Sequence, residues 1–137
     1  MENFSRLPRY PFTRAMIEHA PDGFGVYGLF EGGELVYIGR ATRGMSIKAC
    51  LEMHLDGVLG ACTATATHYT WELGQWPSAR ETELLNAFGK AHGREPRCQG
   101  FQADVDQAIE RGARHVRNRL TDPNERRFEA VKEEDGR

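Results

Sequence analysis

The sequence predicts one α/β domain, in which a three-stranded antiparallel sheet is flanked by helices and followed by a C-terminal helical extension. Two apolar runs flank a Glu-Gly-Gly-Glu turn within residues 25–40, which is typical of a β-hairpin. Stretches of helical periodicity then alternate with one further stretch of strand periodicity. The 137 residues suffice for a single core.

The chain begins with a segment, residues 1–20, in which two prolines precede one short helix. Thr13 is a suitable N-cap, and the helix is expected to run over residues 13–20 and to stop before Pro21. Residues 21–100 form the predicted α/β domain. Residues 101–122 carry the apolar spacing of an amphipathic helix, and residues 123–137 are expected to be a charged, flexible tail.

The register of the hairpin decides where its two tyrosines point. A two-residue turn at residues 32–33 would pair Phe30 with Leu35 and place Tyr27 and Tyr37 on opposite faces. A three-residue loop at residues 31–33 would instead place Tyr27 directly opposite Tyr37. We favour the second register, because it gathers a set of small and apolar residues on the opposite face. These residues are Val26, Gly28, Phe30, Val36 and Ile38.

The rest of the domain has clear helix and strand signals. Ser46 is an N-cap for a helix over residues 47–55, which places Cys50 and His54 one turn apart. Residues 60–66 are expected to form a loop, and residues 67–73 alternate as a third strand. Ser78 and Glu81 predict a capping box for a helix that ends at Gly93. Its buried stripe is expected to comprise Leu84, Leu85 and Phe88.

Composition and charge narrow the function classes. The net charge of -2 supplies no general attraction to nucleic acid, so an anionic partner requires a local cationic patch. No stretch approaches the roughly 20 apolar residues that span a bilayer, and we expect no membrane contact. Cys50, Cys62 and Cys98 lack paired spacing, which favours reduced thiols. We therefore expect a cytoplasmic protein.

The hairpin carries a recognisable pair of triplets, Gly25-Val26-Tyr27 and Tyr37-Ile38-Gly39. They resemble the signature of the GIY-YIG nuclease family, and the resemblance continues over residues 21–99. Further matches are Arg40 after the second triplet, His54 at the end of a helix, Glu81 three residues before Leu84-Leu85, and the sequence PRCQ ending at Gln99. The resemblance implies a GIY-YIG-like sheet with both tyrosines on its active face.

The resemblance also implies an activity, the hydrolysis of DNA phosphodiester bonds with Mg²⁺ or Mn²⁺ as cofactor. Glu81 would bind the metal, because hard cations prefer carboxylate oxygens, although a capping box alone also explains this residue. Tyr27 would act as general base or position water, and Tyr37 would orient water or phosphate. His54 would relay a proton or contact phosphate, and its alternative role is a hydrogen bond at a helix end.

Two residues depart from the family pattern. Cys50 stands where the family has its catalytic arginine, and a thiol carries no positive charge. Gln99 stands in place of an asparagine. Arg40, Arg43 or Lys48 would have to supply the missing cation. Arg43, Lys48, Arg94, Arg97 and Gln99 are the candidate substrate-binding residues, and solvent-facing charge at a helix end is the alternative for Arg94 and Arg97.

Two other functions remain open from the sequence. A catalytically degenerate module of the same fold would bind nucleic acid or a protein partner without cleaving anything. Alternatively, Cys50 and His54, one helical turn apart, could form a soft-metal or redox site. Cys62 and Cys98 would then be its further ligands.

Overall fold

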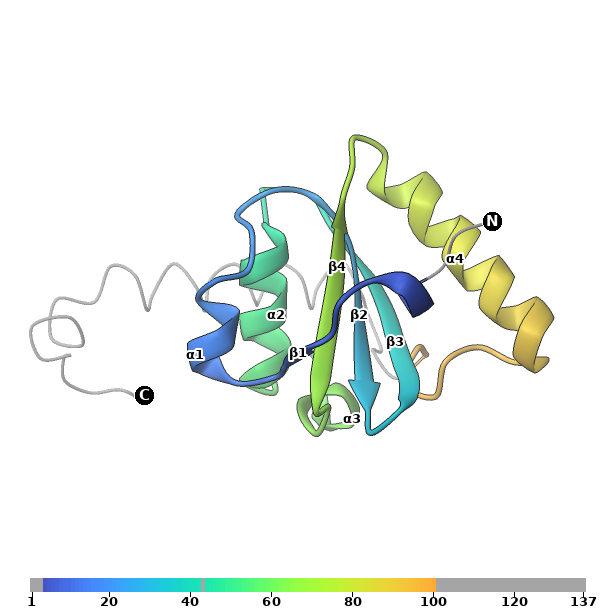
Figure 1. The fold of residues 1–137 in the computed structure, drawn as a ribbon, viewed down its shortest axis with the longest axis horizontal. Helices are drawn as coiled ribbons and strands as arrows, with labels where there is room; N and C mark the ends of the chain where they lie inside the picture. Colours follow the sequence, from blue (N-terminus) through green and yellow to red (C-terminus); the bar gives the residue numbers. More distant parts are fainter. Residues whose placement is uncertain (1–3, 43, 101–137) are drawn as a thin grey trace, which may run out of the picture.

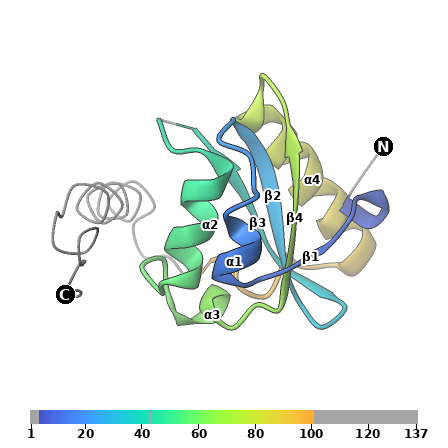
Figure 2. The same cartoon turned by 60° about the vertical axis from the view of Figure 1, so that its left-hand side comes forward.

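The computed structural model describes residues 4–42 and 44–100, which form a central sheet with helices on both faces (Figure 1). In chain order the elements are η1 (Phe4–Arg6), β1 (Tyr10–Pro11), α1 (Arg14–Ile17), β2 (Gly25–Glu31), β3 (Glu34–Ala41), α2 (Ile47–Leu55), α3 (Ala61–Ala64), β4 (His68–Leu73) and α4 (Pro77–His92). Helices α1 and α2 lie on one side of the sheet and α4 on the other (Figure 2).

The sheet is antiparallel and has the strand order β1-β4-β2-β3. The predicted α/β class is confirmed, whereas the predicted count of three strands is wrong. The additional strand β1 pairs Tyr10 with Tyr69 at the edge of the sheet. It is two residues long and contains Pro11, which only an edge strand tolerates, and so it carries no strand periodicity.

The hairpin turns through Gly32-Gly33, because Glu31 pairs with Glu34 and Phe30 with Leu35. The predicted three-residue loop is therefore wrong, and so is the direct pairing of the two tyrosines. The register shifts between Leu29 and Phe30, so that Leu29 lies opposite Tyr37 and Tyr27 lies opposite Gly39. A bulge of this kind moves every later residue to the other face. As a result Tyr27 and Tyr37 share one face, as neighbours along a diagonal.

Both faces of the sheet are buried. Tyr27, Leu29 and Tyr37 pack toward α1 and α2, and Val36 joins them instead of lying with Ile38 as expected. The bulge explains this difference, because Val36 is the residue of β3 that has no partner in β2. Val26, Phe30 and Ile38 pack on the opposite side against Leu84 and Phe88 of α4. The tyrosine face is thus a second core and not an open surface.

The helices follow the sequence signals with three exceptions. Thr13 caps α1 as predicted, but the helix ends at Ile17 and does not reach residue 20. Ser46 Oγ accepts the Ala49 N–H and caps α2 as predicted. Helix α4 begins at Pro77, one residue before the predicted N-cap, and no side chain caps it. The predicted capping box of Ser78 and Glu81 is therefore wrong, since proline suits the first helical position and moves Ser78 into the first turn. Helix α3 lies where a loop was expected.

The chain after α4 returns to the edge of the sheet. Gly93 ends the helix in the left-handed conformation, with φ 71°. The Cys98 N–H then donates to the Val36 carbonyl at 2.8 Å. Arg43, the predicted helix 101–122 and the predicted tail 123–137 lie outside the described residues. Within the described part, none of the helices has the length and apolar character needed to cross a membrane.

Candidate active site

A chain of buried hydrogen bonds links three elements beside the sheet. The Tyr27 hydroxyl on β2 lies 2.8 Å from His54 Nε2 on α2. His54 Nδ1 lies 2.7 Å from Thr63 Oγ1 on α3. All three side chains are at most 2% exposed. Both ring nitrogens of His54 are therefore engaged, and the ring is fixed between a phenol and a hydroxyl.

Gly39 makes room for this arrangement. A Cβ at position 39 would lie 2.4 Å from Tyr27 Cζ and 2.8 Å from Tyr37 Cε2, far inside contact distance. The Tyr27 ring therefore lies directly over the backbone of β3. Tyr37 contacts the same histidine, with 4.8 Å between the two ring centroids. The glycine of the second triplet thus has a steric role in placing both tyrosines.

Burial sets the protonation states of this chain. It raises the pKa of Tyr27 well above 10, and Cys50, Tyr37 and the negative charge of Glu81 raise it further. Burial lowers the pKa of His54 from 6.5 to about 3. Tyr27 is therefore a neutral phenol and His54 a neutral imidazole at pH 7. A neutral imidazole has one donor and one acceptor nitrogen. The direction of the hydrogen bond with Thr63 therefore fixes the direction of the hydrogen bond with Tyr27.

Cys50 occupies the space beside Tyr27. Its side chain is 6% exposed and shares a hydrogen bond with Tyr27. Burial raises the pKa of the thiol from 9.0 to about 12. Cys50 is thus an uncharged thiol in contact with the phenol, and any cation of this site must come from another position.

Arg40 carries a positive charge at the end of β3. Its Nη1 donates to Glu81 Oε1 at 2.7 Å, which joins the end of β3 to the first half of α4. The Arg40 side chain is 34% exposed and that of Glu81 is 14% exposed. Glu81 also lies close enough to Tyr27 to raise the pKa of its phenol. The ion pair lies on the α4 face of the sheet, and the tyrosine chain lies on the face of α1 and α2. Of these groups Arg40 is the most exposed.

The carboxylate of Glu81 suits a hard cation that keeps most of its water ligands better than one that is surrounded by protein ligands. Glu81 Oε1 accepts from Arg40, and Oε2 has no hydrogen-bond partner in the part of the chain that the structure describes. No cluster of three or more His, Cys, Asp or Glu side chains within that part could hold a metal ion. A single carboxylate fits Mg²⁺, which keeps several of its waters when it binds protein.

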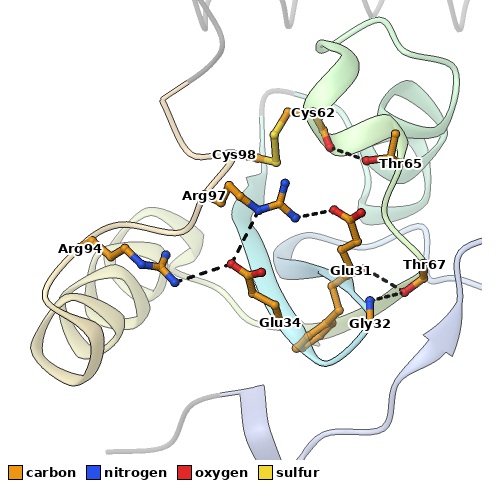
Figure 3. A network of polar contacts seen from close by, with 10 residues as sticks. Glu31, Gly32, Glu34, Cys62, Thr65, Thr67, Arg94, Arg97 and Cys98 are labelled. Carbon is orange, nitrogen blue, oxygen red and sulfur yellow. Dashed lines mark hydrogen bonds and ion pairs between the residues drawn. A yellow bond between two sulfur atoms is a disulfide. The ribbon is translucent and has the colours of Figure 1, made fainter.

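The predicted substrate-binding residues at the C-terminal side of α4 lie elsewhere. Arg94 pairs with Glu34 at 3.6 Å, and Arg97 pairs with Glu31 and Glu34 (Figure 3). These contacts are at the turn between β2 and β3, whereas Arg40 lies at the far end of β3. The strand between them spans roughly 20 Å at about 3.3 Å per residue. The structure therefore does not bring Arg94 and Arg97 to the site of Glu81.

Two further candidates have defined backbone contacts. The Gln99 side chain accepts from the Ile38 N–H at 3.0 Å and donates to the Ile38 carbonyl at 2.7 Å. Its amide thus extends the sheet at the edge of β3. Lys48 lies in the first turn of α2 and is half-buried, and its N–H donates to the Pro21 carbonyl. Arg43 is outside the described residues.

The cysteines differ from the expectation. Cys62 and Cys98 form a disulfide across a sequence separation of 36 residues, so the prediction of three reduced thiols is wrong. The pair was not evident in the sequence because the two residues come from unrelated elements. The disulfide also removes both thiolates from the soft-metal site considered above. Thr63 was missed as well, since it lies in a small polar stretch without a motif.

A pocket of about 250 Å³ lies on the α4 side of the sheet, away from Tyr27 and His54. It is lined by the second half of α4, including Phe88 and His92, and by Phe4, Phe30 and Leu35. Neither Tyr27 nor Glu81 lines it. The pocket is thus separate from the candidate site.

No protein-family model matches the chain, and no curated protein sequence matches it. Its function therefore has to be argued from the chemistry of these side chains.

Proposed function

We propose that the protein is a GIY-YIG-type endonuclease, a hydrolase that cleaves DNA phosphodiester bonds with Mg²⁺ or Mn²⁺. The observation that carries the proposal is the hydrogen bond between the Tyr27 hydroxyl and the neutral, buried His54, together with an Arg40–Glu81 ion pair whose carboxylate acts electrostatically on Tyr27. This arrangement combines a group that positions water, a cation and a carboxylate. Phosphodiester hydrolysis needs these parts.

Tyr27, held by His54, positions the attacking water. The raised pKa of Tyr27 keeps the proton on the phenol, and the lowered pKa of His54 keeps the imidazole neutral. Nε2 accepts the hydrogen bond of the Tyr27 hydroxyl, and Nδ1–H donates to Thr63 Oγ1. The Tyr27 oxygen accepts a hydrogen bond from the water that attacks phosphorus. The proton of that water leaves to solvent on the open Arg40 side, and the bond from phosphorus to the leaving oxygen breaks as that oxygen takes up a proton from solvent.

Arg40 and Glu81 act on the phosphate. Arg40 contacts Glu81 through Nη1, and its partly exposed guanidinium has further N–H groups with which to bind a phosphoryl oxygen. Glu81 is the residue that would hold the divalent cation. When bound, such a cation offsets the charge that grows on the phosphoryl oxygens and makes a bound water more acidic.

Burial defines the direction of approach. Tyr27 is 2% exposed and Tyr37 is 8% exposed, whereas Arg40 is open to solvent. We expect the phosphate to contact the Arg40 side of the site, with a water molecule reaching Tyr27 from there. Tyr37 then orients the buried groups, since its ring packs against both Tyr27 and His54.

The alternative function is a catalytically degenerate module that binds nucleic acid or protein. Cys50 favours it, because a neutral thiol fills the position of the expected arginine and adds to the raised pKa of Tyr27. In that case Arg40 and Glu81 are a structural ion pair between β3 and α4. DNA binding would then be independent of divalent metal.

The test compares nicking of supercoiled and branched DNA by the wild type, Glu81→Gln and Glu83→Gln, each with Mg²⁺ and with Mn²⁺. Glu83 is the matched control, because it lies on the same helix, pairs with Arg80 and is 57% exposed. We expect a loss of about 100-fold or more in Glu81→Gln, since an electrostatic group of the transition state is removed. Glu83→Gln should keep wild-type activity.

Two results would contradict the nuclease. Equal cleavage by the wild type and Glu81→Gln would show that Glu81 has no part in the reaction. A wild type that binds DNA without metal and cleaves none of the substrates would support the degenerate module.

A further inference from the structure

The disulfide joins two segments that meet beside the candidate site. Cys62 lies in α3, and Cys98 lies in the segment that follows α4 (Figure 3). Thr63, the next residue after Cys62, holds Nδ1 of His54. The covalent bond is therefore one residue away from the hydrogen-bond chain that ends at the Tyr27 hydroxyl.

The two segments differ in how firmly they are held. Residues 94–99 bind the hairpin through ion pairs of Arg94 and Arg97 (Figure 3). The side chain of Gln99 adds two hydrogen bonds to the backbone of Ile38. Helix α3 has four residues and no side-chain cap. It packs against α2, and one covalent bond and one side-chain hydrogen bond join it to other described elements, namely the disulfide and the hydrogen bond between Thr63 and His54.

From this difference we propose that the Cys62–Cys98 disulfide is a redox switch that positions Thr63 against His54. In the oxidised protein the firmly bound segment holds α3 in place, and Thr63 fixes the orientation of the His54 ring. After reduction α3 loses its covalent link to that segment, and the hold on His54 weakens. The effect on DNA cleavage rests on the proposed nuclease function, whereas the effect on His54 does not.

The switch needs an external dithiol reductant. A thiolate of the dithiol attacks Sγ of Cys62, which is half-buried, while Cys98 is 1% exposed and leaves as its thiolate. The second thiol of the reductant then displaces Cys62. The dithiol becomes a disulfide, and its two electrons and two protons leave Cys62 and Cys98 as thiols. An oxidised dithiol reverses the reaction.

The first measurement is a thiol count on protein purified without reductant. Alkylation in denaturant followed by mass spectrometry should find one free thiol, Cys50, and three after treatment with dithiothreitol. Three free thiols in the untreated protein would overturn the inference.

The second measurement follows the ring nitrogens of His54 by NMR in the oxidised and reduced full chain. Oxidised protein should show one fixed tautomer, and reduction should shift both nitrogen signals toward the average of an exchanging ring. Thr63→Val should give the reduced pattern in both redox states, and Thr63→Ser should restore the response. His54 signals that do not change on reduction would overturn the inference.

The third measurement is DNA nicking by the same samples after the reductant is removed. We expect a loss of about three-fold to ten-fold on reduction, the effect of one weakened hydrogen bond. The Cys62→Ser/Cys98→Ser variant should match the reduced protein with and without dithiothreitol. If no sample cleaves DNA but the His54 signals respond, the switch stands and the nuclease fails. If the oxidised and the reduced protein both cleave DNA at the same rate, the proposal that the disulfide controls cleavage would be overturned.

Discussion

At the scale of single residues, two positions define the candidate site, the neutral thiol of Cys50 and the missing side chain of Gly39. The Cys50 thiol contacts Tyr27. Gly39 leaves the space over which the Tyr27 ring lies. In the proposed nuclease, Arg40 of β3 would supply the cation that Cys50 does not. The space at Gly39 has no such substitute, because any side chain there would overlap the Tyr27 ring.

Gly39→Ala is expected to lower the free energy of unfolding by about 2 kcal/mol, because the new methyl group overpacks the site. Its Cβ would lie 2.5 Å from the Tyr27 hydroxyl oxygen, so the phenol must also move away from His54. Urea denaturation measures the stability, and DNA nicking measures the effect on the site.

The control for this substitution is Gly33→Ala. A Cβ at Gly33 meets nothing within 4 Å, and Gly33 is not among the glycines with positive φ. Equal stability of the two variants would show that the Tyr27 ring is not confined by β3.

At the scale of secondary structure, the sequence predicted those elements that carry their own signals. Ser46 and the apolar spacing behind it located α2, and the alternation after Thr67 located β4. The two-residue strand β1 and the four-residue α3 were missed, since both are too short for a period to appear. The bulge in the hairpin was missed as well, because it is decided by packing on both faces of the sheet and not by the turn residues.

In the candidate site, too, the residues in local motifs could be predicted from the sequence, and those that depend on contacts between elements could not. The sequence motifs named Tyr27, Tyr37, Arg40, His54 and Glu81 as candidates. The structure brings both tyrosines to His54 and, on the other face of the sheet, Arg40 to Glu81. Thr63 and the disulfide depend on how separate elements meet, which no local pattern records. Arg94 and Arg97 were chosen for their nearness in sequence to Gln99, and they lie instead at the hairpin turn.

The segment after α4 offers a prediction at this scale. Gln99→Leu removes both hydrogen bonds to the Ile38 backbone, and we expect a loss of about 1–3 kcal/mol in the free energy of unfolding. The Ile38 amide should also exchange faster with solvent, which hydrogen exchange measured by NMR would detect. Gln75→Leu is the control at an exposed glutamine. An Ile38 amide that is equally protected in Gln99→Leu would refute the sheet-like role of Gln99.

At the scale of the whole molecule, paired charges limit how the protein can bind DNA. The net charge is -2, and many arginines of the described part are in ion pairs with carboxylates. These are Arg14 with Asp56, Arg40 with Glu81, Arg80 with Glu72 and Glu83, Arg94 with Glu34, and Arg97 with Glu31 and Glu34. A strong general attraction to DNA is thus not expected, and we expect recognition of a DNA shape or help from a partner.

The buried histidine makes the stability of the whole fold depend on pH. His54 is fully buried, and its pKa is about 3 in the folded protein against an ordinary value of 6.5. Above pH 6.5 the histidine is neutral in both the folded and the unfolded chain, and its contribution to stability is complete. Below that pH the unfolded chain binds a proton that the folded chain does not. The free energy of unfolding should then fall by up to about 1.4 kcal/mol per pH unit, until the pH approaches 3.

Urea denaturation between pH 7 and pH 4.5 tests this slope, with the wild type, His54→Gln and His19→Gln compared under the same conditions. His54→Gln should start from a lower stability at neutral pH, since it disturbs the contacts with Tyr27 and Thr63, but its stability should fall less steeply toward acid. His19 is exposed, and His19→Gln should keep the wild-type slope. Proton binding by His54 is identified by the change in how steeply the free energy of unfolding depends on pH, and not by the stability at neutral pH. If His54→Gln and the wild type lose stability in parallel, His54 takes up its proton in the folded protein, and the buried neutral imidazole that holds the Tyr27 hydroxyl in the proposed reaction would have to be abandoned.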